Sequence, residues 1–234
     1  IKLNSFLIAG LLLLSACNKQ QFVVPEESKS FEQAVTYNNK VDIVLMVDNS
    51  SSMDIYQNKL ANQVPEMLSA LDQVGMDYQI VVVTTDMRST GNGGKFTGTP
   101  RVLTNGSANL AAALTARVKQ GTSGSDLERG LLSIKTALSP AYLNSAGRGF
   151  LRNDALLAVI VLSNEDDRSD GDLQEYKTFF EQLKPNMKTA FGDTRSWMVN
   201  FIGVPNLQSS CSTSLDGAYK EAGLRWIELA NYTG

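Results

Sequence analysis

The chain has 234 residues, with 21 Lys plus Arg, 24 Asp plus Glu, two Cys and no His. Without imidazole it can build neither a Ser-His-Asp triad nor a His-ligated zinc site, and its two cysteines lie too far apart for a CxxC pair. A net charge of -3 without any Lys/Arg run argues against nucleic-acid binding. The length of the chain and its 43% hydrophobic residues predict one globular α/β domain. Any metal site in it could use only oxygen ligands.

The first residues have the pattern of a signal peptide. Lys2 precedes an apolar run from Phe6 to Leu14 that is too short to cross a bilayer. The tetrad Leu14-Ser15-Ala16-Cys17 resembles the lipobox of bacterial lipoproteins, in which the cysteine carries the lipid. It predicts a lipoprotein signal peptide at residues 1–16, lipidation of Cys17 and membrane attachment through that anchor.

The residues after the lipobox predict a tether and then a single domain. Asn18 favours the outer over the inner membrane, by a sorting rule best known from enterobacteria. Residues 17–39 are polar and contain Pro25, which predicts a flexible tether before a domain at residues 40–234. The chain begins without Met and stops directly after an apolar stretch, so we expect both ends to be trimmed relative to the gene product.

Strand and helix patterns alternate along the domain. β-branched apolar runs predict buried strands at Val41–Val47, Tyr78–Thr84, Leu156–Leu162, Trp197–Gly203 and Arg225–Leu229, with a short edge strand at Pro100–Thr104. Apolar spacings of three and four predict helices at Asp54–Val74 (kinked or broken at Pro65), Ala108–Val118, Asp126–Leu138, Asp172–Leu183 and Ser214–Ala222. This alternation predicts a doubly wound, mainly parallel central sheet flanked by helices, with its functional site at the carboxyl ends of the strands.

A candidate metal-binding motif follows the first predicted strand directly. Asp48-Asn49-Ser50-Ser51-Ser52 places one carboxylate and two hydroxyls at alternate positions of a strand-to-helix turn, where they can converge on one cation. A small set of oxygen ligands suits Mg²⁺, Mn²⁺ or Ca²⁺. Asp and Ser are also ordinary helix N-cap residues, so the motif by itself is equally compatible with simple capping.

In its context after the VDIVLMV strand, this motif resembles the metal-ion-dependent adhesion site (MIDAS) of the von Willebrand factor A (vWA) family, whose fold is Rossmann-like. The resemblance implies that Asp48, Ser50 and Ser52 bind the metal. It extends to residues 124–131, where Ser125 takes the place of a family Thr and Thr122 is the competing choice. The phrases VDNS, VTTD, GFLR and SNEDD further resemble a group of bacterial vWA lipoproteins.

The third element of the family's site is an Asp that closes a central strand, and the matching residue here is Asn164. An amide in place of a carboxylate weakens cation binding, and Glu165 or Asp166 could compensate directly or through water. Asp86, at the end of the neighbouring strand, either contacts the metal ligands without binding the metal itself or caps its own loop.

Several other residues remain open to more than one interpretation. The acidic residues Glu165, Asp166, Asp167, Asp170 and Asp172 could form a glycosidase-like acid pair or a Ca²⁺ site, but a solvated loop is favoured because an acid pair needs a shaped cleft. Cys211 has no partner once Cys17 is acylated, so we expect either a partner beyond Gly234 or a free buried thiol. The aromatic residues predicted to lie in the core are Trp197, Phe201 and Trp226.

The sequence therefore predicts a lipid-anchored module of the bacterial cell envelope that binds a protein ligand through a divalent cation. The cation would bridge to an acidic residue of the partner. The alternatives are a metal-independent scaffold, which Asn164 favours, and a hydrolase that uses the acidic loop. We do not expect an enzyme, because the chain has no His, no activated nucleophile motif and no Gly-rich phosphate loop.

Overall fold

The computed structural model describes residues 39–189, 192–206 and 221–234. Several predicted features lie outside the described residues: the signal peptide with Cys17, the tether up to residue 38, Cys211 and most of the helix predicted at Ser214–Ala222. The structure therefore addresses the predicted domain and not its membrane anchor.

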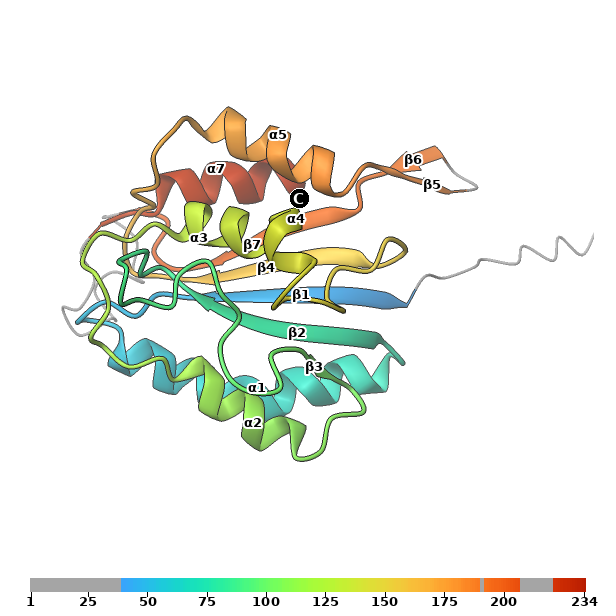
Figure 1. Cartoon of the computed structure of the whole chain (residues 1–234), viewed down its shortest axis with the longest axis horizontal. Helices are drawn as coiled ribbons and strands as arrows, with labels where there is room; N and C mark the ends of the chain where they lie inside the picture. Colours follow the sequence, from blue (N-terminus) through green and yellow to red (C-terminus); the bar gives the residue numbers. More distant parts are fainter. Residues whose placement is uncertain (1–38, 190–191, 207–220) are drawn as a thin grey trace, which may run out of the picture. The chain divides into compact units, whose positions relative to one another are not determined.

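A five-stranded sheet forms the centre of the domain, with β1 in its middle (Figure 1). The strands are β1 Lys40–Val47, β2 Asp77–Thr84, β3 Leu103–Thr104, β4 Leu156–Leu162 and β7 Trp197–Ile202. β1 pairs in parallel with β2 and β4, β7 pairs in parallel with β4, and β3 pairs antiparallel with β2. Val47 lies opposite both Thr84 and Leu162, so the three central strands end at the same level.

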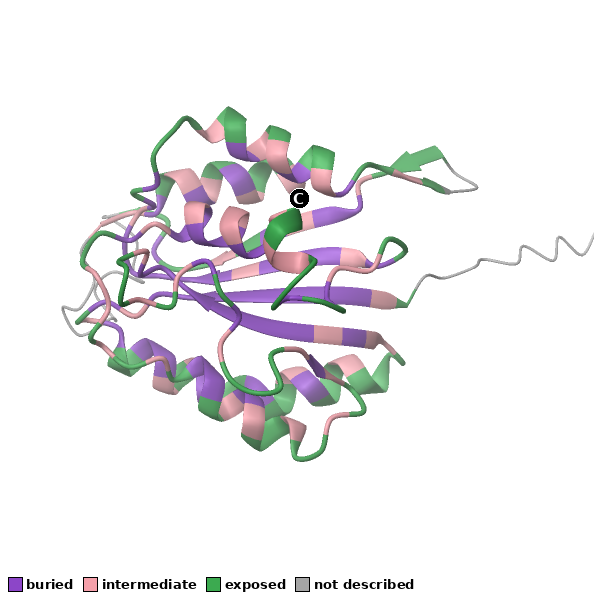
Figure 2. Cartoon of the chain, viewed as in Figure 1, coloured by how far each residue is buried: buried purple, intermediate pink, exposed green. Residues whose placement is uncertain are grey.

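Helices cover both faces of the sheet (Figure 1). One face carries α1 Asp54–Gln73 and α2 Leu110–Val118. The other carries α3 Gly130–Ala137, the short α4 Pro140–Leu143, α5 Leu173–Leu183 and α7 Leu224–Thr233. The strands are buried along most of their length and the outer sides of the helices are exposed (Figure 2).

The predicted fold class needs correction. The sequence predicts a doubly wound, mainly parallel sheet of the Rossmann-like kind, whereas the structure has a mixed sheet with mostly parallel strands. The antiparallel strand is β3, because the chain returns from β2 through a loop at residues 85–102 and not through a helical crossover.

Several predicted elements also differ from the structure. The final strand predicted at Arg225–Leu229 is wrong, because these residues lie inside α7. Trp226 and Leu229 are both buried, three positions apart, as on one face of a helix. The apolar run is too short for its pattern to distinguish a strand from a helix. α1 continues past the exposed Pro65 without a break, and α3 begins only at Gly130. The sequence also missed α4 and the hairpin of β5 Met187–Thr189 and β6 Gly192–Thr194.

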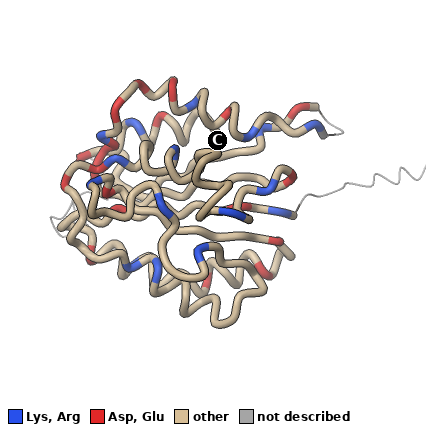
Figure 3. The backbone as a smooth tube through the Cα atoms, in the orientation of Figure 1, with Lys and Arg blue, Asp and Glu red and all other residues tan. Residues whose placement is uncertain are grey.

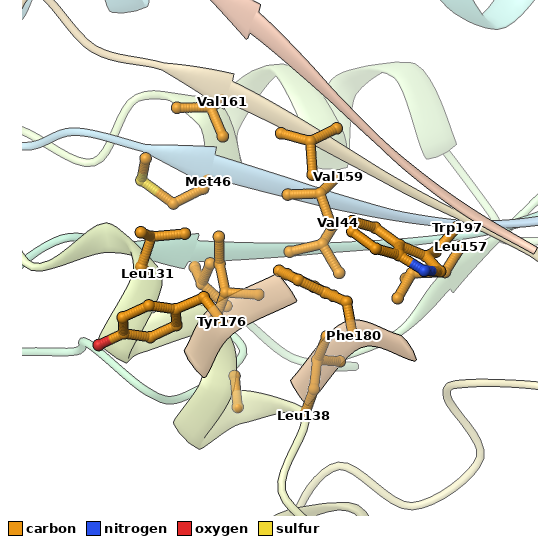
Figure 4. Close-up of a cluster of buried hydrophobic side chains, with 14 of the residues drawn as sticks. Val44, Met46, Leu131, Leu138, Leu157, Val159, Val161, Tyr176, Phe180 and Trp197 are labelled. Atoms are coloured by element: carbon orange, nitrogen blue, oxygen red, sulfur yellow. The ribbon is translucent and has the colours of Figure 1, made fainter. Parts of the chain in front are cut away.

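Alternate residues of the strands pack into two hydrophobic cores. Val44 and Met46 face the core beneath α3, α5 and α7, where Phe180 stacks on Trp197 with ring centroids 4.8 Å apart (Figure 4). Neighbouring residues of β1 point into the second core, against α1 and α2. The predicted core positions of the two tryptophans are confirmed, and Phe201 is partly buried against the first core.

One ion-pair network closes the amino-terminal end of the sheet. Asp42 in β1 is 0% exposed, and Arg152 Nε donates to its Oδ1 at 2.8 Å. The same guanidinium donates to Asp77 Oδ1 at 2.7 Å and to the carbonyl oxygens of Val41 and Asp77. Burial raises the pKa of Asp42, and its hydrogen bonds and ion pair with Arg152 oppose that rise. Arg152 thus ties β1 and β2 to the loop before β4.

Replacing Arg152 should therefore destabilise the domain strongly. Arg152→Met leaves the Asp42 carboxylate buried without its ion pair, so the free energy of unfolding should fall by about 3 kcal/mol. Guanidinium denaturation followed by circular dichroism measures this change. The control is Asp154→Asn, which breaks the exposed pair of Lys40 and Asp154 and should not move the midpoint. Equal midpoints for Arg152→Met and the wild type would contradict this role.

Candidate metal centre

The loops after β1, β2 and β4 meet at the carboxyl end of the sheet. Asp48 follows β1, and its backbone N–H donates to Leu162 O at 3.0 Å, which holds the start of the loop against β4. Ser163 and Asn164 follow β4, and both are buried. The parallel register therefore brings together residues that are more than a hundred positions apart in the sequence.

Asp48 is the most deeply buried acidic residue at this end. It is 0% exposed; its Oδ1 accepts from Ser50 N at 2.8 Å and its Oδ2 from Ser163 Oγ at 2.7 Å. Burial raises the pKa of Asp48, the hydrogen bonds from Ser50 and Ser163 lower it, and the charge of Glu165 raises it further. Among the described residues, no Lys or Arg forms an ion pair with Asp48.

The two predicted serine ligands differ in their surroundings. Ser50 is 0% exposed and its Oγ has no hydrogen-bond partner within the described part of the chain. Ser52 is half-buried, and its Oγ accepts from Asn164 Nδ2 at 2.9 Å. The structure thus brings Asp48, Ser50, Ser52 and Asn164 to one place, with the amide of Asn164 donating to one of the predicted metal-binding hydroxyls.

Glu128 belongs to this centre, and sequence reasoning missed it. It is 2% exposed, and neither carboxylate oxygen has a hydrogen-bond partner among the residues described. Burial, followed by the charges of Asp48 and Glu165, raises the pKa of Glu128 to about 8. The sequence offered one signal for Glu128, which is its position at the end of the 121–129 loop, just before α3. It was overlooked because only the hydroxyl residues of that loop were considered as metal ligands.

Glu165 is the third carboxylate of the centre. It is 8% exposed, and its charge contributes to the raised pKa values of both Asp48 and Glu128. Across the ranges that the structure covers, however, no three acidic, His or Cys side chains gather closely enough to hold one metal ion. A cation here would therefore need hydroxyl, amide or water oxygens in addition to carboxylates.

Gln57 fixes the loop after β1 to the loop before α3. Its Nε2 donates to Asp48 O and Gly121 O, both at 2.9 Å, and its Oε1 accepts from Gly121 N at 3.1 Å. Gly124 N also donates to Asn49 O at 2.8 Å, and a Cβ at Gly124 would lie only 2.5 Å from that oxygen. The two loops are thus held in register by a buried amide and by a glycine that permits close approach.

Two further candidate ligands lie in the loop at residues 121–129, which Gln57 and Gly124 hold against the Asp48 loop. Ser125 Oγ accepts from Leu127 N at 3.0 Å within its own loop, and Thr122 is half-buried in the same loop. Both carboxylate oxygens of Asp86 accept from Arg88, at 2.8 and 2.7 Å, and this holds the pKa of Asp86 below its ordinary value. Arg88 in turn donates to Ser123 O at 2.6 Å, so the Asp86 ion pair links its own loop to the loop at residues 121–129.

The acidic loop after Glu165 is solvated at Asp170 and Asp172, and several of its carboxylates also stabilise helix ends. Asp167 has a fully buried side chain; it accepts from Leu131 N of α3 at 2.9 Å and pairs with Arg225 at 3.2 Å. Asp166 accepts from Arg225 N at 2.8 Å. Asp172 caps α5 by accepting from Glu175 N at 2.9 Å, and Asp170 pairs with Arg129 at 3.6 Å. Charges of both signs accordingly lie in these loops (Figure 3).

No family model and no curated protein matches the chain. Among solved structures, proximal thread matrix protein 1 from the mussel byssus is 13% identical with a TM-score of 0.44, over 83% of this chain and 46% of that one. The pilus adhesin SpaC from Lactobacillus rhamnosus GG is 12% identical with a TM-score of 0.43, over 83% and 30%. The PilB minor pilin from Streptococcus sanguinis is 16% identical with a TM-score of 0.33, over 53% and 29%.

These comparisons correct the expected family. No family model supports vWA membership, and the three structural neighbours are a thread matrix protein, an adhesin and a pilin. This chain spans less than half the length of each neighbour. The vWA assignment is therefore not retained, and the domain is described by its own mixed sheet and site residues.

Within the described ranges, no helix is long and apolar enough to span a membrane.

In the metal-free protein, Glu128 should make stability fall as the pH rises. Between its ordinary pKa of 4.5 and its folded pKa of about 8, the unfolded chain has lost this proton and the folded chain retains it, so rising pH favours unfolding. Asp48 acts in the same direction, and the absence of His leaves the interval free of imidazole titration.

Thermal unfolding in EDTA at several pH values checks this expectation. The midpoint should decrease from about pH 5 to about pH 8, and the decrease should be shallower in Glu128→Gln. A wild-type midpoint that rises over this interval would show that the folded state does not hold the proton.

Proposed function

We propose that the domain binds a divalent cation at the carboxyl end of its sheet and, through that cation, a carboxylate of a protein partner. Asp48, Ser50 and Ser52 would hold the cation, with Asn164 beside them. The observation that carries the proposal is the Ser50 hydroxyl, which is fully buried next to a buried carboxylate and has no partner among the described residues. A buried polar atom without a partner is costly unless a ligand satisfies it.

The chemistry of the donor set fits a hard cation. Every candidate ligand atom is an oxygen, and the chain has no His and no nearby pair of Cys that would select zinc or copper. Mg²⁺ and Mn²⁺ are suited to a few protein oxygens with positions left for water or a partner's carboxylate, and Ca²⁺ is the third choice. The half-buried Ser52 lies at the outer side of the set, where a partner could approach.

The membrane part of the proposal rests on sequence alone. The lipobox-like tetrad ending at Cys17 would anchor the domain to the bacterial envelope, and Asn18 favours its outer membrane. A cation-dependent binding module displayed there would act as an adhesion or assembly protein and not as an enzyme.

One observation favours a second candidate, a metal-independent envelope scaffold. Asn164 Nδ2 donates to Ser52 Oγ at 2.9 Å, so this hydroxyl already has a protein partner. In that case the loops would be held by their own hydrogen bonds, and partner binding would not depend on a cation.

Direct titration with Mn²⁺ separates these candidates. Isothermal calorimetry on the protein should detect one site, and Asp48→Asn should weaken Mn²⁺ binding by more than about tenfold because an anionic oxygen is lost. Asp170→Asn, in an exposed residue of a neighbouring loop, is the matched control and should leave the affinity unchanged. No Mn²⁺ binding by the wild type would exclude the cation site.

Partner binding should depend on the same cation. Immobilised wild-type domain in Mg²⁺ should retain an envelope protein that EDTA elutes and that immobilised Asp48→Asn does not retain. Quantitative mass spectrometry of the eluates measures this difference. Retention that is equal with Mg²⁺ and with EDTA would favour the metal-independent scaffold.

A further inference from the structure

Glu128 is a buried carboxylate whose surroundings leave its charge unbalanced. It is 2% exposed, both of its carboxylate oxygens lack hydrogen-bond partners, and no Lys or Arg pairs with it within the described residues. The charges that act on it are those of Asp48 and Glu165, which are both acidic, and its carboxyl group lies within hydrogen-bonding reach of Glu165. An arrangement of this kind is unfavourable unless a proton or a cation occupies it.

The backbone around Glu128 holds this side chain in place. Arg168 N donates to Glu128 O at 2.7 Å, and the next residue, Arg129, donates its N–H to Thr85 O at 3.2 Å. These bonds tie the residue to the loop after β4 and to the loop after β2. α3 follows directly, and Asp167 caps its first turn through Leu131 N. Glu128 is thus built into the junction of three loops.

Asp48 and Glu128 differ in what their oxygens can still bind. Each oxygen of Asp48 already accepts one hydrogen bond, from Ser50 N and from Ser163 Oγ. Asn164 contributes a neutral amide whose Nδ2 is directed to Ser52. Glu128 accepts no hydrogen bond from an N–H group or a hydroxyl of the described residues and meets only the carboxyl group of Glu165. The unpartnered Ser50 Oγ provides an independent sign of a ligand at this end of the sheet.

We propose that Glu128 is a direct ligand of the divalent cation and supplies the second negative charge that Asn164 does not. This inference rests on the proposed function, since it concerns the same cation. With Asp48 and Glu128 both ionised, a divalent ion is neutralised by two carboxylates, and Ser50 Oγ gains the partner that it lacks. Glu165 lies beside them and adds to the negative field that attracts the ion.

The competing account makes Glu128 a protonated side chain that shares its proton with Glu165 and has no role in metal binding. Glu128→Gln distinguishes the two, because glutamine keeps the volume and a hydrogen-bond donor while removing the charge. Glu128→Asp retains the carboxylate but shortens the side chain. Glu66→Gln, in an exposed residue of α1, makes the same charge change away from the centre.

The experiment is calorimetric titration of Mn²⁺ alone into each folded variant, with folding checked by circular dichroism. Loss of an outer-sphere partner typically weakens metal binding about 10- to 100-fold, so loss of a direct ligand in Glu128→Gln should weaken Mn²⁺ binding about 100-fold or more. Glu128→Asp should bind with intermediate affinity, and Glu66→Gln should match the wild type.

The outcomes separate this inference from the proposed function. If the wild type binds Mn²⁺ and Asp48→Asn does not, but Glu128→Gln and Glu128→Asp bind like the wild type, Glu128 is not a ligand and the inference is overturned. If the wild type itself does not bind Mn²⁺, both the proposed function and the inference fail. If Glu128→Gln does not fold, intermediate Mn²⁺ affinity of Glu128→Asp supports the inference and wild-type affinity overturns it.

Discussion

Both ends of the central strand carry an aspartate that is 0% exposed, and the two carboxylates are compensated in opposite ways. Asp42 at the start of β1 has the guanidinium of Arg152, whereas Asp48, just after the end of β1, has only hydrogen-bond donors from Ser50 and Ser163. Burying an ionised carboxylate without a counter-charge is among the least favourable things a protein core can do. The first end is therefore a closed structural junction, and the second is the end at which we propose that a cation binds.

Hydrogen bonds between loops hold the surroundings of Asp48 in place. Gln57 holds the loop that precedes α3 against the backbone of Asp48, and Asp167 caps α3. Together they keep Glu128 buried beside Asp48 although both are acidic. The acidic residues Asp166, Asp167 and Asp172 bind helix ends and Arg225, so they support this arrangement.

The sequence predicted the sheet's long strands well, and it placed Asp48 correctly after the end of β1, because buried parallel strands are long apolar runs. It failed where the signal was short or non-local. Arg225–Leu229 has too few residues to reveal a helical period, and the antiparallel pairing of β3 depends on a loop path that no residue pattern encodes. Glu128 was missed because its importance comes from burial beside residues 80 and 37 positions away. The vWA resemblance, drawn from short phrases, was not supported by any family model.

The central claim is that a divalent cation lies between Asp48 and Glu128. Crystals of the domain grown with Mn²⁺ and measured at the manganese absorption edge test it most directly, because the anomalous signal locates the ion independently of any variant. The account predicts one strong peak within coordination distance of Ser50 Oγ and a Glu128 carboxylate oxygen, with Asp48 bound directly or through water. Anomalous maps without a peak at this position, in crystals saturated with Mn²⁺, would contradict it.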